Sequence, residues 1–128
     1  MYEELKEDVI QRLKSLNYTV KPTDEFALQF IIDKVEQDIK NKTNQDEVPS
    51  ELHFVFVERV CGEFLRSMMA SKLLSDEQID SVVTSIKEGD TNISFDVNSS
   101  PQAKFDAYTK YLANSGNDDF AKFRRFVW

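Results

Sequence analysis

The residues best able to do chemistry are the only histidine, His53, and the only cysteine, Cys61. Neither residue has a second potential zinc ligand at the spacing of a His-x-x-x-His or Cys-x-x-Cys motif. The two lie eight positions apart in one predicted helix, and two helical turns hold their side chains beyond hydrogen-bond reach. A Cys–His nucleophile pair is therefore disfavoured. We expect Cys61 to be a small buried hydrophobic residue.

Phosphate binding and acid–base catalysis have no better support. Three glycines in the whole chain leave no glycine-rich phosphate loop. Carboxylates gather at two predicted helix starts, residues 3–8 and 76–80, where the positive end of the helix dipole accounts for them. We therefore expect a protein that is not an enzyme and that carries no metal and no cofactor.

The C-terminal segment, residues 118–128, combines three phenylalanines, three cations and the only tryptophan. Aromatic and arginine residues are enriched at interface hot spots, whereas so few cations beside two aspartates neutralise little nucleic-acid phosphate. We predict a protein interface made by Phe120, Phe123, Arg124, Arg125, Phe126 and Trp128. For Phe120 and Phe123 a place in the protein's own core is equally open, because buried aromatic residues most often serve the core.

Charge and composition exclude several classes of protein. The net charge of −7 and a pI near 4.7 argue against wrapping nucleic acid. The charge is −4 over residues 1–74, −5 over 75–100 and +2 over 101–128, so only the last part is basic. No apolar run reaches the ~18 residues of a membrane span, and the acidic start differs from a signal peptide. A single cysteine allows no disulfide framework, so we expect a protein made in a cytoplasm, without membrane contact.

Apolar residues at steps of three and four predict a single domain of amphipathic helices. The expected helices are residues 3–17, 23–42, 51–74, 75–89 and 101–113, with a short one from 118. Ser75 with Gln78 forms a capping box, and Ser100 before Pro101 marks another start. The third helix is predicted to be the longest and is apolar over much of its circumference. The expected fold class is all-α, a bundle of about five to six helices around a long central helix.

Residues 92–97 differ from the rest because polar and apolar residues alternate there, which predicts a strand. A lone strand cannot satisfy its backbone, so we expect near residues 91–98 either a short β-hairpin that folds back on itself or an extended arm that pairs with another partner, with a neighbouring subunit as the candidate. Its candidate inter-subunit contacts are Ile93, Phe95 and Val97. The domain would then comprise a helical core (1–88), the arm (89–100), and C-terminal helices with a docking tail (101–128).

The order of these pieces resembles the tailed-phage head–tail connector family, small adaptor proteins that bind beneath the portal ring. The matching pieces cover nearly the whole chain: residues 25–39 before a polar loop, Val48-Pro49-Ser50-Glu51-Leu52 opening the third helix, Lys87-Glu88 leading into residues 89–95, and Phe123-Arg124-Arg125-Phe126-Val127-Trp128.

The resemblance implies a structural virion protein of a phage or prophage, made in the bacterial cytoplasm. Such a protein forms a ring that continues the DNA channel from the portal and allows tail attachment. The implied partners are the portal, further copies of the chain, and a tail or head-closure protein, with DNA passing through transiently. Under this interpretation the C-terminal segment docks on the portal.

Two other interpretations stay open. The chain could be a small helical regulatory module of a mobile element that binds protein or DNA through residues 123–128, and salt-dependent DNA binding would favour that function. It could also be a cytoplasmic enzyme subunit, which would require turnover without an evident base, metal or phosphate loop.

Overall fold

The structure is a computed structural model that describes residues 2–89 and 100–124. In these two stretches the chain forms five α-helices and three short 3-10 helices, without a strand, so the predicted all-α class is confirmed. The predicted arm near 91–98, with Ile93, Phe95 and Val97, lies outside the described residues. The α-helices are α1 (Tyr2–Ser15), α2 (Glu25–Thr43), α3 (His53–Ala70), α4 (Asp76–Gly89) and α5 (Pro101–Ala113); the 3-10 helices are η1 (Pro22–Asp24), η2 (Ser50–Leu52) and η3 (Phe120–Phe123).

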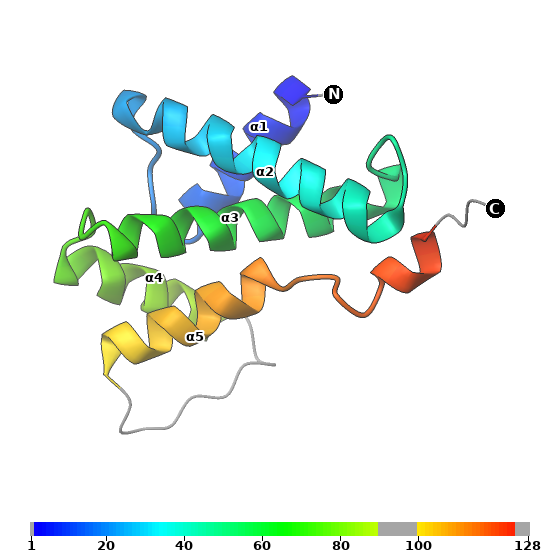
Figure 1. The fold of residues 1–128 in the computed structure, drawn as a ribbon. Helices are drawn as coiled ribbons and strands as arrows, with labels where there is room; N and C mark the ends of the chain where they lie inside the picture. The colour runs from blue at the N-terminus through cyan, green and yellow to red at the C-terminus, as the bar shows by residue number, and fades with distance from the viewer. Residues whose placement is uncertain (1, 90–99, 125–128) are drawn as a thin grey trace.

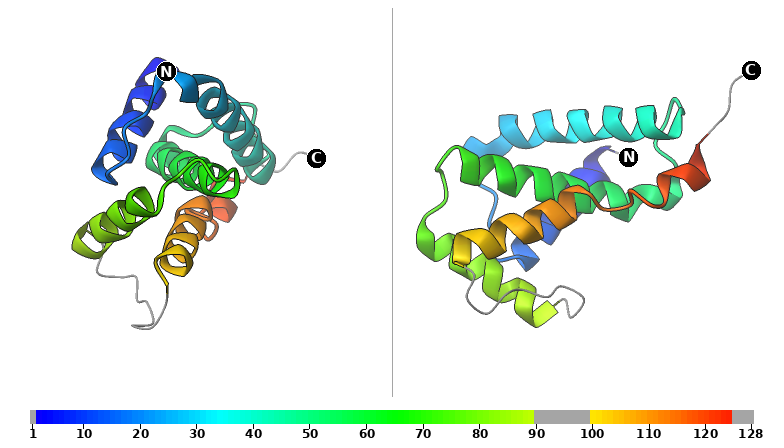
Figure 2. Two further views of the ribbon diagram at one scale, coloured as in Figure 1. Left: turned by 90° about the vertical axis from the view of Figure 1, so that its left-hand side faces the viewer. Right: turned by 60° about the horizontal axis from the view of Figure 1, so that its bottom comes forward.

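Helix α3 contacts α1, α2 and α5, while α4 packs against α5 (Figures 1 and 2). Its buried side chains include Phe56, Val60, Phe64 and Met68, which follow the apolar stripe of the sequence. Helix α3 approaches α5 closely at Gly62, where a Cβ atom would stand 2.4 Å from the backbone nitrogen of Ala113. A residue without a side chain therefore lets the two helices touch.

The third helix is shorter than the predicted 51–74, and it is not the longest. It has 18 residues, whereas α2 has 19. At its start, Ser50–Leu52 form a 3-10 turn behind Pro49 instead of α-helix. At its end, Lys72 adopts a left-handed conformation with φ 58°, and the amide of Leu73 donates to Met68 O at 3.0 Å. The left-handed residue and this hydrogen bond together end the helix, because the bond satisfies one of the last helix carbonyls while the left-handed residue turns the chain off the helix axis.

The two predicted N-terminal caps are confirmed. The Ser75 amide donates to Gln78 Oε1 at 2.9 Å and the Gln78 amide donates to Ser75 Oγ at 3.2 Å. The Ala103 amide donates to Ser100 Oγ at 3.1 Å, directly before the helix that Pro101 opens. Each cap satisfies amides that a helix start leaves unpaired.

Among the helices of the described stretches, none combines the length and the apolar character that crossing a membrane requires.

Candidate docking site at the C-terminal segment

The turn after α5 directs the C-terminal segment toward the C-terminal end of α2. Gly116 has φ +78°, and its carbonyl accepts hydrogen bonds from the amides of Asp119 at 2.8 Å and Phe120 at 3.2 Å. A Cβ atom at Gly116 would lie 2.5 Å from Val55 Cγ1 on α3. Only glycine fits both this conformation and this contact. Helix η3 consequently lies against α2, where Figure 1 shows it near the end of the bundle.

Arg59 on α3 fixes this turn from inside the protein. Its side chain is only 5% exposed, and Nη1 donates to Ser115 O at 2.6 Å and to Asn117 Oδ1 at 2.9 Å. Nη2 donates to Asp38 Oδ2 on α2 at 3.3 Å. One guanidinium thus joins α3, α2 and the chain before η3, using the fixed fork of donors that arginine offers.

Phe120 is held by the same cation. The residue is 4% exposed, the Arg59 Cζ atom lies 4.9 Å from the ring centroid, and Lys42 Nζ lies 5.6 Å from the same centroid. Cations over an aromatic face are attracted by the ring quadrupole, more strongly where water is excluded. Phe120 is therefore part of the protein's own core, and Phe123 packs partly buried against that core.

The backbone that follows is attached to the loop after α2. The Gln45 side chain donates a hydrogen bond from Nε2 to Phe123 O. Arg124 is exposed and is the last residue that the structure describes. Of the predicted interface residues, Phe120, Phe123 and Arg124 thus lie together at one end of the bundle, whereas Arg125, Phe126 and Trp128 lie outside the described residues. The core position of Phe120 narrows the predicted interface to the residues that come after it.

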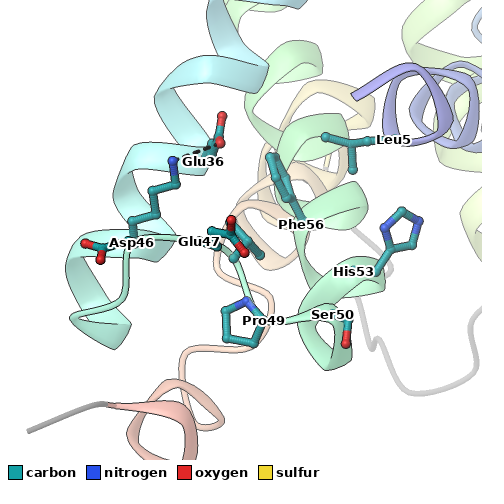
Figure 3. A pocket seen from close by; sticks show the side chains of 10 residues that line it. Leu5, Glu36, Asp46, Glu47, Pro49, Ser50, His53 and Phe56 are labelled. Atoms are coloured by element: carbon teal, nitrogen blue, oxygen red, sulfur yellow. Dashed lines mark ion pairs between the residues drawn. The ribbon is translucent and has the colours of Figure 1, made fainter. Parts of the chain in front are cut away.

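A pocket of about 320 Å³ opens beside this attachment point, between α1, the end of α2, the loop after α2 and the start of α3. Figure 3 shows Leu5, Phe56 and His53 on one side of it, and Asp46, Glu47 and Pro49 on the other. Leu5 and Phe56 are buried and Val48 is half-buried, so the floor is apolar. The pocket is lined by Leu5, Glu36, Lys40, Asp46, Glu47, Val48, Pro49, Ser50, His53 and Phe56.

The rim of this pocket is acidic. Three lining carboxylates, Glu36, Asp46 and Glu47, face one lining ammonium, Lys40, whose Nζ lies 3.0 Å from Glu36 Oε1. Counted with neutral histidine, the lining carries a net charge of −2. An apolar floor under a negative rim suits a group that brings both hydrophobic surface and positive charge. We call this hollow the acidic pocket.

His53 and Cys61 have separate partners. His53 Nε2 lies 2.7 Å from Asp8 Oδ2 on α1. Cys61 is buried, as predicted, and its thiol lies 3.7 Å from Val9 O. Burial raises the pKa of the Cys61 thiol above its ordinary range, with the nearby Glu58 carboxylate acting in the same direction. This thiol therefore stays protonated and unreactive in the folded protein.

In residues 2–89 and 100–124, no three His, Cys, Asp or Glu side chains gather closely enough to hold a metal ion.

Two exposed aromatic side chains lie in the N-terminal part of α2, away from its contact with η3. Phe26 is 83% exposed and Phe30 is 61% exposed, one helical turn apart on the same face. Large exposed apolar residues that lie together mark interaction surfaces more often than single ones do. This pair was not predicted from the sequence, although both residues lie off the apolar stripe of residues 28–39, which is a signal for exposed aromatic side chains.

Arg59 and the acidic pocket were also missed. The signal for Arg59 is a charged residue inside the apolar stripe of α3, between Phe56 and Val60. Such a position is costly unless the charge is paired. The acidic pocket left no comparable signal, because its walls come from four segments that only the fold brings together.

Comparison of the chain with known proteins gives no match: none of the family models, curated proteins or solved structures is significantly similar to it.

Proposed function

We propose that this chain is a head–tail connector of a tailed phage or prophage, a structural virion protein without enzymatic activity. In this proposal it forms a ring beneath the portal, continues the DNA channel and allows the tail to attach. Its partners are the portal, neighbouring copies of itself and a tail or head-closure protein. It acts in the virion after synthesis in the bacterial cytoplasm.

The observation that carries the proposal is the attachment of the C-terminal segment. Arg59 and Phe120 fix its base within the core, and the Gln45 side chain holds the carbonyl of Phe123. A cationic and aromatic tail that starts from a rigid base loses less entropy on binding than a free chain end does. We therefore propose that the segment beginning at Arg124 docks on the portal.

The exposed pair Phe26 and Phe30 supports assembly into a ring. A ring closes through a heterologous interface, in which one surface of a copy meets a different surface of the next. This pair offers one such surface on α2, and the extended arm with Ile93, Phe95 and Val97 is proposed as the other.

The acidic character of the chain suits the passage of DNA. A protein with a net charge of −7 neutralises few phosphates, so its contact with DNA releases few counterions and is weak. Such a ring would let DNA slide instead of gripping it. A strongly basic lining would hold the genome in the channel.

The test is binding to purified portal rings by a chain that ends after Arg124. This truncation keeps Phe120 and Phe123, whereas removal of residues 118–128 would take a core residue and confuse folding with binding. We expect wild-type protein to add a ring of density to portals in negative-stain images. The shortened chain should bind at least about tenfold more weakly, as loss of a hot-spot cluster implies.

A matched control replaces Leu73, an exposed apolar residue in the loop between α3 and α4, with alanine. This variant should bind portals like the wild type. Wild-type protein that adds no density to portals would contradict the proposed function. Full binding by the shortened chain would contradict the role of the tail alone.

A further inference from the structure

We propose that the acidic pocket binds residues 125–128 of its own chain in an intramolecular contact. The pocket has a floor of apolar side chains and a rim with a net charge of −2. Residues 125–128 are Arg125, Phe126, Val127 and Trp128, one cation with three apolar side chains, two of them large and aromatic. The two surfaces match in both charge and hydrophobic character.

Position supports this occupant. The Gln45 side chain binds the carbonyl of Phe123, and the next two residues after Gln45 are Asp46 and Glu47, which line the acidic pocket. The tail thus starts at the loop that forms one wall of the pocket. Four residues in extended form reach roughly 13 Å beyond Arg124, before the length of a tryptophan side chain is added. That reach exceeds the width of a pocket of this size.

Charge distinguishes the tail from other parts of the chain. Residues 1–74 and 75–100 are both negative, whereas residues 101–128 carry +2. The acidic rim, which belongs to residues 1–74, attracts a positively charged segment of the third region more than a negatively charged segment of the other two. Within the third region only the tail combines consecutive cations, Arg124 and Arg125, with aromatic side chains on both sides.

The tail of the same chain has an advantage over that of a second copy. A short tether gives an effective concentration on the order of 1 mM, well above the protein concentration of a dilute solution. If the isolated tail bound with a Kd of about 0.1 mM, roughly nine tenths of the molecules would hold their own tail. A neighbouring copy would compete only in concentrated samples.

One consequence rests on the function proposed above. If the same residues bind the portal, then docking in the acidic pocket and docking on the portal exclude each other, and free subunits would keep their tail covered. The contact within the isolated chain is a separate claim, and its test needs no portal.

The test uses Trp128, whose fluorescence reports only on the tail because it is the single tryptophan. We expect the full-length protein to show a blue-shifted emission and severalfold less acrylamide quenching than free N-acetyltryptophanamide. Both values should stay constant over a tenfold range of protein concentration. Circular dichroism of every sample checks that the helices are intact.

Charge reversal on either side should weaken the contact. Glu47→Lys and Arg125→Glu should each lower the ratio of docked to free tail about threefold to fivefold, which is the worth of an exposed ion pair. The double variant should recover most of the protection, because it restores the opposite charges. Asp33→Lys, an equal charge change at an exposed position of α2 outside the pocket, should leave the fluorescence unchanged.

Quenching of the folded wild type at the rate of free N-acetyltryptophanamide would overturn the proposal. Protection that rises with protein concentration would also overturn it, because the occupant would then be the tail of a second copy. Protection that persists unchanged in Glu47→Lys and in Arg125→Glu would place Trp128 elsewhere. None of these outcomes depends on whether the protein binds a portal.

Discussion

Arg59 shows how one buried charge can organise a chain end. Its donors bind Ser115 O, Asn117 Oδ1 and Asp38 Oδ2, and its Cζ atom lies over the ring of Phe120. A buried cation is tolerated only where such partners replace water. The residue therefore links the C-terminal segment to α2 and α3 at once.

Arg59→Met should lower the free energy of unfolding by about 2–3 kcal/mol, because it keeps most of the hydrophobic volume but leaves the half-buried carbonyl of Ser115 without its donor. Urea denaturation followed by circular dichroism measures this loss. Arg66→Met is the matched control: Arg66 binds Asp106 at 3.2 Å with a partly exposed side chain, and we expect a loss below about 1 kcal/mol. Equal losses in the two variants would contradict the role given to Arg59.

The Tyr18–Asp24 pair makes stability depend on pH. Tyr18 Oη donates to Asp24 Oδ2 at 2.7 Å, in a pair whose two residues are both buried. Burial, together with the hydrogen bond and charge of Asp24, raises the pKa of Tyr18 well above its ordinary value near 10. Above pH 10 the unfolded chain loses this proton while the folded protein keeps it. The stabilisation is therefore complete below pH 10 and declines as the pH rises further.

Comparison of the wild type with Tyr18→Phe isolates this contribution. At pH 8 the variant should be less stable by about 1–2 kcal/mol, since Asp24 loses a donor. Between pH 10 and 11 the difference should shrink by up to about 1.4 kcal/mol. Urea titrations at each pH measure both values. A difference that stays constant up to pH 11 would show that Tyr18 does not titrate in this way.

At the level of elements, three of the helices end in the same manner. Residues Asn17, Asn44 and Lys72 have positive φ values of 65°, 51° and 58°, and each follows or closes a helix. In each case an amide one residue later bonds back to a helix carbonyl, as Tyr18 N does to Leu13 O at 2.9 Å. These endings set the direction in which the chain continues after α1, α2 and α3.

The contact between α3 and α5 depends on Gly62. A Cβ atom there would lie 2.4 Å from Ala113 N and 2.7 Å from Thr109 O, both backbone atoms that cannot move aside alone. Gly62→Ala should therefore separate the helices and cost about 2 kcal/mol or more, despite the better helix propensity of alanine. Thermal unfolding measures the change. Ser67→Ala, at an exposed site of α3, should stay within about 0.5 kcal/mol of the wild type.

At the level of the whole molecule, charge separates the proposed function from the regulatory alternative. The body is acidic, and the basic part is confined to the end of the chain. A DNA-binding module would show a basic face and an affinity that falls steeply with salt. The connector proposal requires little grip on DNA.

We expect no binding to duplex DNA in mobility-shift assays at about 0.15 M salt, where screening leaves a few exposed cations little effect. Arg124→Glu with Arg125→Glu should behave like the wild type in this assay. A shift that weakens with added salt and disappears in the double variant would instead support a DNA-binding regulatory module.

The sequence by itself determined the local features: the all-α class, the caps at Ser75 and Ser100, the apolar stripe of α3 and the burial of Cys61. Each depends on residues that lie within a few turns of one another, so spacing and side-chain type suffice to predict them. The C-terminal segment was likewise visible as an unusual composition. The sequence did not decide which residues of this segment are buried in the core and which lie outside it.

Only the tertiary structure decided how distant segments meet. It placed Phe120 in the core, brought Arg59 to the turn at Gly116, and assembled the acidic pocket from α1, α2, the following loop and α3. It also corrected the length of the third helix, whose ends depend on the left-handed residue Lys72 and on the turn behind Pro49. The position of Phe120, the partners of Arg59 and the acidic pocket arise from contacts between residues tens of positions apart. The periodicity of a single segment carries no information about such contacts. The ends of the third helix are local, but apolar periodicity does not mark the exact residue at which a helix ends.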